Sequence, residues 1–513
     1  MQNHSLEPVT ILKKNIAANF TGSLVQALMA LLFIPLYIKF LGIEAYGLIG
    51  LFMTMQALFM LLDMGLGATV NREMARLSVL PDKAQEMRDL VRSLEVIYWC
   101  IAVLIGVAVM ALSSFIAGYW VRPKQLSPEV IRQAILIMGL AIAFQWPVSF
   151  YSGGLMGLQR QVLLNIINTV VATIRWCGAV LVLWLVSPTI HAFFSWQILV
   201  SLLHVFLTSL FLWRSLPATG KRSAFQGKII FGIWRFAAGM SGITILATLL
   251  TQADKIILSK MLSLEMFGYY TLAGMMAMTL YRLIGPVFLA VYPRFTQLVE
   301  LKDQEALKQL YHKACQFMSV LILPATAVIA FFSYEILLLW TGNTVTAKNT
   351  YMLASILIIG TALNGLMNLP YALQLAHGWT RLAFYVNLVS VMLLVPLTML
   401  MAWKYGAIGA SFVWVILNSG YVIIAIQFMH RRLLKREKWI WYEKDVGIPM
   451  LVALATAGVF KWIAGGAYSS PWMSVAILIL ISSVTLGATA LMTPTTRNFV
   501  FNQLMKFKLT YGN

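Results

Sequence analysis

Charged residues are scarce in this chain of 513 residues: they make up 11% of it, against about 25% in a typical soluble domain. Hydrophobic residues make up 60%. A water-soluble fold cannot bury so large an apolar fraction. The composition therefore excludes an ordinary soluble enzyme or binding domain and predicts an integral membrane protein.

Acidic residues and cysteines are also few. The chain has 18 acidic and 38 basic residues, a formal net charge of +20, and three cysteines. An odd number of cysteines without metal-site spacing predicts neither a disulfide framework nor a metal site. The basic excess is spread over short connections and forms no separate domain. We therefore expect it to orient the protein in a membrane, and we expect no nucleic acid partner.

Signatures of soluble catalysis are absent as well. The sequence contains no glycine-rich nucleotide loop ending in lysine and no HExxH zinc motif, and Gly65–Ala68 does not match a dinucleotide loop. We therefore expect that the protein is not an enzyme and needs no cofactor.

Long apolar runs dominate what is present. About 14 runs reach the roughly 20 residues that cross a bilayer, and the polar connections between them are short. Lys and Arg concentrate in alternate connections, such as Arg72–Arg92 and His430–Lys444, so both termini are predicted to be cytoplasmic. The runs begin near Asn15, Ala45, Leu94, Ile131, Val162, Ala192, Ile230, Met266, Cys315, Tyr351, Leu382, Ala407, Val446 and Pro471.

One short motif occurs twice. KFLGIEAYGLIGL at Lys39–Leu51 is matched by KMLSLEMFGYYTL at Lys260–Leu272, which is 221 positions later. This offset predicts two parallel repeats of six spans, a construction that transporters use with the substrate site between the halves. We predict an N-terminal lobe over residues 1–220, a C-terminal lobe over 221–438, and two further helices with a cytoplasmic tail over 439–513.

Polar residues recur at helical spacing in the first and seventh runs. Such stripes can hold helices together by hydrogen bonds. Because they match between the two repeats, they favour a shared aqueous cavity for substrate. The candidate lining residues are Asn19, Ser23, Gln26, Thr244, Thr248 and Lys255.

Two arginines, Arg175 and Arg282, fall near the middle of apolar runs. An arginine there is costly and usually faces a bundle interior or an aqueous path, although an ion pair with another helix is the alternative. We predict that both arginines line the substrate path, with Arg282 at the interface between the lobes. The alternative for Arg175, in the fifth run, is that it supports only its own half. Lys14 and Arg235 are predicted to attract a charged headgroup at the inner mouth. The carboxylates nearest the bilayer are candidates for ion coupling: Asp63, Asp254 and Glu335.

The repeated motif, KMLSLEMFGYYTLA following Asp254, resembles the signature of polysaccharide transporters in the MOP exporter superfamily. GLMGLQRQ at Gly154–Gln161 and YGAIGASFVW at Tyr405–Trp414 extend the resemblance. This group includes Wzx-type O-antigen flippases, with MATE antiporters and MurJ as relatives. The resemblance implies two six-helix lobes around a central cavity, plus two C-terminal helices.

The resemblance also implies a function: moving an undecaprenyl-diphosphate-linked oligosaccharide across the bacterial inner membrane. It implies a proton or sodium gradient as the energy source, membrane lipids as surroundings, and a polysaccharide polymerase with chain-length machinery as further partners. The alternatives are a multidrug:cation antiporter of the same superfamily and a membrane glycosyltransferase or polymerase. Cavity arginines argue against the first, and short outer loops argue against the second.

Overall fold

The computed structural model describes residues 28–63, 65–80, 82–227, 245–246, 248–379, 381–463 and 470–497. Over these ranges the chain is almost entirely helical, and the only β-type pairing is an isolated bridge between Arg122 and Ser263. The predicted all-α class is confirmed. Helices suit a bilayer because each one satisfies its own backbone polar groups.

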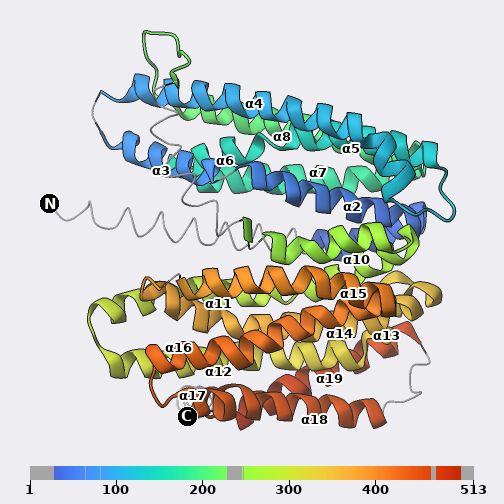
Figure 1. The fold of residues 1–513 in the computed structure, drawn as a ribbon, viewed down its shortest axis with the longest axis vertical. Helices are drawn as coiled ribbons and strands as arrows, with labels where there is room; N and C mark the ends of the chain where they lie inside the picture. The colour runs from blue at the N-terminus through green and yellow to red at the C-terminus, as the bar shows by residue number, and fades with distance from the viewer. Residues whose placement is uncertain are drawn as a thin grey trace, which may run out of the picture. The chain divides into compact units, whose positions relative to one another are not determined.

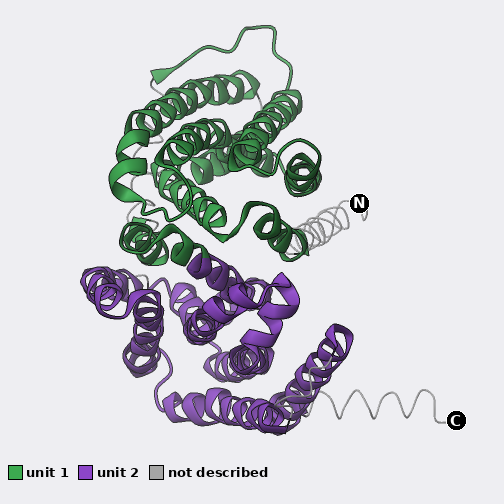
Figure 2. Cartoon of the chain, turned by 90° about the vertical axis from the view of Figure 1, so that its right-hand side faces the viewer, with its two compact units in different colours: residues 1–268 green, residues 269–513 purple. Residues whose placement is uncertain are grey.

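The chain divides into two compact units, residues 1–268 and residues 269–513 (Figure 2). In the first unit α5 packs on α4 and α8, α7 packs on α8, and α3 packs on α6 (Figure 1). Its described helices are Leu28–Leu41, α2 (Ile43–Phe59), α3 (Leu66–Ser78), α4 (Ala84–Phe115), α5 (Pro128–Gln145), α6 (Val148–Gly157), α7 (Gln161–Leu185), α8 (Ile190–Ser215) and 248–261.

In the second unit α14 packs on α11, α12, α13 and α15, while α18 and α19 pack on α12. Its first helix, α10 (Leu264–Met278), begins before the boundary between the units. The others are α11 (Tyr281–Glu300), α12 (Gln304–Phe331), α13 (Ser333–Thr341), α14 (Thr344–Ala376), α15 (Arg381–Gly420), α16 (Ile426–Arg432), α17 (Lys438–Ile440), α18 (Ile448–Ile463) and α19 (Pro471–Met492).

Some helix starts follow directly from the local sequence. The Ser127 side chain accepts a hydrogen bond from the backbone N–H of Val130, and Pro128 is the first residue of α5. Ser470 and Pro471 do the same at the start of α19. Because the first N–H groups of a helix have no partner within it, a Ser-Pro pair fixes where the helix begins.

Eleven helices among the described residues are long and apolar enough to cross a membrane, and Leu28–Leu41 is a shorter apolar helix. The longest, Arg381–Arg432, turns back at Gly406, where a φ of 60° favours glycine. The multi-pass architecture is confirmed. The number of fourteen spans stays a prediction, because parts of the first and seventh runs lie outside the described residues.

The two copies of the repeated motif pack against each other. A Cβ on Gly47 would lie 2.4 Å from the backbone oxygen of Leu264, and a Cβ on Gly268 would lie 2.4 Å from that of Ile43. These four residues are related pairwise by the offset of 221 positions. The contact is reciprocal and lies within residues 1–268, and both glycines are needed for the close approach of the helices.

The glutamates of the motif both contact the connection that contains Lys124. Glu44 is buried and accepts hydrogen bonds from the backbone N–H groups of Lys124 and Gln125, at 2.6 and 2.9 Å. Its counterpart in the second copy, Glu265, pairs with the ammonium group of Lys124 at 2.9 Å. The repeated Glu therefore has a structural role next to the repeated Gly.

Candidate functional site

Arg175 lies near the middle of α7, and neutral amides hold it. Its guanidinium group donates to Gln197 Oε1 of α8 at 2.9 Å and to Gln145 Oε1 of α5 at 2.7 Å. Among the described residues no carboxylate forms an ion pair with it. The alternative considered from the sequence was a buried ion pair at Arg175. No described carboxylate is placed to form it.

A cavity of about 110 Å³ opens next to this guanidinium, within the first unit. Its polar lining residues include Tyr46, Gln56, Arg175 and Gln197, and Tyr37 contributes an aromatic wall. The Tyr46 hydroxyl is buried and makes no hydrogen bond. A buried hydroxyl without a partner costs free energy, so a polar or anionic group in the cavity would be favourable.

A chain of polar groups continues from Arg175 through the interior of the first unit. Gln145 Nε2 lies 3.2 Å from Nδ1 of His204, and Nε2 of His204 lies 3.1 Å from Oδ1 of Asn168. These contacts join α5, α7 and α8. The chain fixes the guanidinium in one position, which is the preorganisation that a binding site for an anion requires.

Asp63 ends the short helix η1 (Met60–Asp63) and is held by three donors. Its carboxylate accepts hydrogen bonds from the hydroxyls of Tyr98 and Ser149, at 2.5 and 3.1 Å, and from the backbone N–H of Gly67 at 3.2 Å. The local cause is the break between α2 and α3, which leaves N–H groups of the first turn of α3 open to a side chain. Asp63 is therefore oriented, and no described basic residue pairs with it.

Glu335 lies in the second unit and is paired. Its Oε1 is 2.6 Å from the ammonium group of Lys461 on α18, and the Glu335 side chain is 14% exposed. The other carboxylate oxygen, Oε2, is buried without a hydrogen bond. Glu335 thus joins α13 to α18 within the second unit.

The remaining candidates are more scattered. Arg282 is exposed at the start of α11, although an intramembrane arginine is not expected to face lipid. On helix 248–261, Thr248 and Asp254 are half-buried, and Lys255 donates to Gln252 at 3.3 Å. The residues Lys14, Asn19, Ser23, Gln26, Arg235 and Thr244 lie outside the described part of the chain.

The sequence reasoning missed a polar pocket of about 270 Å³ in the second unit. Tyr281 donates to Asn364 Oδ1 at 2.8 Å, and Asn364 donates to Asn418 Oδ1 at 2.8 Å. Asn368, Gln374 and Asn387 also line the pocket, as do Asn364 and Tyr421. The signal was present, because Asn364, Asn368 and Tyr371 share one helical face at spacings of four and three.

The amide partners of Arg175 were missed in the same way. On α8, Gln197, Ser201, His204 and Thr208 recur at spacings of four, three and four, the pattern that identified the other stripes.

Over the described residues, no group of three or more His, Cys, Asp or Glu side chains is arranged to hold a metal ion.

Comparison with known proteins places the chain in a family. Residues 12–299 match the profile of the family described as "Polysaccharide biosynthesis protein". No curated protein sequence matches the chain.

Solved structures share its fold. The lipid II flippase MurJ, in an inward closed conformation, has a TM-score of 0.66 at 14% identity and covers 92% of this chain and 97% of its own. An inward-facing multidrug resistance MATE family transporter of the MOP superfamily has a TM-score of 0.62 at 14% identity, covering 80% and 94%. The Vibrio cholerae MATE transporter VcmN has a TM-score of 0.58 at 15% identity, covering 84% and 99%. These three neighbours are a flippase and two transporters, and at such identities the likeness concerns the fold.

Proposed function

The chain belongs to the polysaccharide biosynthesis protein family, and from that premise we propose that it flips an undecaprenyl-diphosphate-linked oligosaccharide by alternating access. The substrate is an O-antigen unit or a similar surface polysaccharide unit, and it moves from the cytoplasmic to the periplasmic leaflet of the bacterial inner membrane. The family and the transporter fold make the protein a multi-pass membrane flippase or transporter. The substrate and the direction are our proposal.

The proposal rests on the hydrogen bonds and the cavity that surround the Arg175 guanidinium. A guanidinium group in the middle of a span, held by two amide oxygens beside a small cavity, keeps its positive charge available for an anion. A diphosphate needs such compensation because an isolated anion in a low-dielectric interior is very costly. The guanidinium fork also matches the geometry of phosphate oxygens. A site for cationic drugs would need the opposite charge.

The other basic candidates take supporting roles in this proposal. Arg282 is exposed in a helix that crosses the membrane, and such arginines usually face an aqueous cavity. We assign it to the diphosphate path, with Lys14 and Arg235 attracting the headgroup at the cytoplasmic mouth. The sugars are assigned to hydroxyl, amide and ammonium groups of the two stripes: Asn19, Ser23, Gln26, Thr244, Thr248 and Lys255.

Energy coupling is assigned to a proton or sodium ion that binds a carboxylate in one conformational state more tightly than in the other. Asp63 is the first candidate, because three donors orient it and no basic residue described here neutralises it. Asp254 is the second. Glu335 is the third, because the Lys461 ammonium already occupies one of its oxygens.

The orientation can be tested directly with two exposed lysines, Lys348 and Lys444. We propose that the termini and Lys444 face the cytoplasm and that Lys348 faces the periplasm. Cysteines placed at the two positions should react with a membrane-impermeant maleimide from opposite sides. Labelling of both positions from the periplasm would contradict this topology.

Transport by the purified protein tests the function. Proteoliposomes would receive an undecaprenyl-diphosphate oligosaccharide in one leaflet, and its appearance in the other would be measured with a membrane-impermeant glycosidase. Arg282→Ala should slow flipping about tenfold or more, since a charged hydrogen bond contributes about 1.5–3 kcal/mol. Arg282→Lys should keep part of the activity. Arg294→Ala is the matched control, on the exposed surface of the same helix.

Two outcomes would overturn the proposal. Uptake of a cationic dye without any flipping of the glycan lipid would favour the multidrug:cation antiporter. Transfer of sugars to a new acceptor would favour a membrane glycosyltransferase or polymerase. In cells, a deletion strain should accumulate the glycan lipid in the inner leaflet, upstream of the polymerase and the chain-length machinery.

A further inference from the structure

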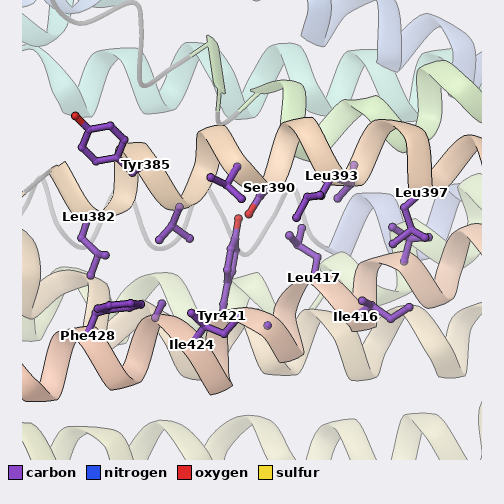
Figure 3. Close-up of a pocket in the computed structure, with 16 residues that line it drawn as sticks. Leu382, Tyr385, Ser390, Leu393, Leu397, Ile416, Leu417, Tyr421, Ile424 and Phe428 are labelled. Atoms are coloured by element: carbon purple, nitrogen blue, oxygen red, sulfur yellow. The ribbon is translucent and has the colours of Figure 1, made fainter.

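An apolar groove of about 540 Å³ lies between two antiparallel helices of the second unit. Figure 3 shows Leu382, Leu393 and Leu397 on the first half of α15, and Leu417 and Phe428 on the chain that follows Gly406. Almost all of the side chains that line the groove are apolar, and most of them are branched or aromatic. Such a lining suits a flexible hydrocarbon chain.

The groove adjoins the polar pocket of the same unit. Four residues line both: Leu382, Val386, Tyr421 and Ala425. Tyr421 marks the junction. Figure 3 shows its ring crossing the groove toward Ser390, and its hydroxyl donates to Asn387 Oδ1 of the polar pocket at 3.3 Å. A ligand that fills both spaces must have an apolar chain joined to a polar group.

Basic residues flank one end of the groove. Arg381 directly precedes Leu382, and Arg431 and Arg432 follow Phe428 by three and four positions. All three arginines are exposed, and the Arg432 guanidinium lies 4.4 Å from the centre of the Trp379 ring. Positive charge at this end suits an anionic group on the same ligand.

We propose that this groove holds the prenyl chain of the glycan lipid when the substrate first binds, with the diphosphate at the arginines and the first sugars in the amide pocket, before both move on to Arg175, Arg282 and the polar stripes. The inference rests on the proposed function and adds a site for the lipid tail. An anionic phospholipid would fit the groove and the arginines, but it has no sugar hydroxyls for Asn364, Asn368 and Asn387. Since bilayer tails are as apolar as the groove, the groove selects by shape and by the attached headgroup.

Photo-crosslinking tests the site in the full-length protein. The probe is undecaprenyl diphosphate carrying a disaccharide and a diazirine on the prenyl chain, in vesicles of phosphatidylethanolamine and phosphatidylglycerol. Cross-links should map to Leu382–Leu397 and Val413–Phe428. Gly420→Leu should reduce them about tenfold, because overfilling a packed site costs on the order of a factor of ten in affinity. A Cβ on Gly420 meets no atom within 4 Å, so the added side chain enters the groove and not a neighbouring helix.

Gly487→Leu is the matched control. A Cβ on Gly487 also meets no atom within 4 Å, and the residue lies on α19, away from the groove. The control should cross-link like the wild type. If Gly420→Leu does not fold, Val389→Trp takes its place, since Val389 lines the groove from the other helix and is 53% exposed.

The results separate this inference from the proposed function. Unchanged cross-linking in both folded groove variants would overturn the tail site, as would equal labelling of the groove by a diazirine phosphatidylglycerol. A two-isoprene analogue with the same headgroup should bind wild type and Gly420→Leu equally. If this analogue and the long probe both fail to bind the wild type, the result contradicts both the proposed function and the tail site. If the wild type flips the glycan lipid but its groove is not labelled, the result contradicts only the tail site.

Discussion

The two units place polar groups in an apolar interior in different ways. In the first, Arg175 and Asp63 are each held by neutral donors or acceptors, and neither forms an ion pair among the described residues. In the second, Glu335 is paired with Lys461, and amides and two tyrosines supply the polar part of the pocket lining. An ion pair cancels its own charge, whereas a charge held by neutral groups stays available for a ligand. On this comparison we propose that the first unit supplies the charge held inside a span, whereas the second unit supplies Arg282, the arginines at its surface, the amide pocket and the apolar groove.

The largest expected effect is at Arg175. Arg175→Ala should slow flipping about a hundredfold, since losing a buried charge-assisted contact with phosphate costs about 3 kcal/mol. Arg175→Lys should retain part of the rate. The measurement is the initial flipping rate in proteoliposomes, normalised to folded protein. Arg132→Ala serves as control, because it removes only an exposed pair with Glu129.

A purely structural role for Arg175 makes the opposite prediction. Arg175→Met would then lower the unfolding temperature, because α5, α7 and α8 lose their shared hydrogen bonds, while the rate per folded molecule stays at the wild-type value. That result would contradict the proposal that the first unit binds the charged part of the substrate through Arg175.

Asn364 in the amide cluster of the second unit should also contribute to stability. Asn364→Leu leaves the Tyr281 hydroxyl without its acceptor and Asn418 without its donor, which should cost about 2 kcal/mol in the free energy of unfolding. Thermal unfolding in detergent measures this cost. Adding Tyr281→Phe should recover part of it, because the unsatisfied hydroxyl is then gone. A lack of recovery would show that the hydroxyl is not the source of the loss.

Measurements of gradient-driven transport can distinguish Asp63 from the two other candidate carboxylates, Asp254 and Glu335. Asp63→Asn should reduce gradient-driven transport about tenfold and leave downhill exchange unchanged, because a neutral amide cannot bind a proton or a sodium ion as the carboxylate does. Flipping would be measured with and without an imposed gradient. The double variant Asp254→Asn/Glu335→Gln should stay coupled. If the double variant is uncoupled and Asp63→Asn is not, the coupling site belongs outside Asp63.

The smallest effect is expected at the ion pair of the second unit. Lys461→Met removes the more exposed partner of a partly buried pair and should lower the free energy of unfolding by about 1 kcal/mol. Lys461→Met/Glu335→Gln should be closer to wild type, since no charge is then left without its partner. Equal or greater loss in the double variant would show that Glu335 contributes apart from Lys461.

Much of the architecture could be predicted because the bilayer imposes strict rules on sequence. Long apolar runs specify helices, and the short connections between them leave no room for a soluble domain. The repeated motif was visible in the sequence, but the reciprocal packing of Gly47 and Gly268 between its two copies was not predicted. The pairing of Glu44 with the Lys124 loop could not be predicted, because the 80 positions between them carry no periodic signal.

The candidate site was less accessible to sequence reasoning. Arg175 was recognisable as a charge inside an apolar run, but its partners lie on other helices, 22 and 30 positions away. Helical spacing relates residues within one helix and does not state which face of a neighbouring helix it meets. For the same reason Asn364 and Asn418 could be assigned to polar faces but not to each other.

By itself, the sequence determined that this protein is a helical membrane protein with an internal repeat and with arginines inside its spans. Composition and apolar run length predict the membrane helices, and the repeat and the arginines are visible along the chain. None of these properties depends on which helices become neighbours. Only the tertiary structure decided that amides hold Arg175, that Lys461 pairs with Glu335, and that an apolar groove adjoins the amide pocket. Those outcomes depend on which helices are neighbours, and packing between distant segments sets this arrangement.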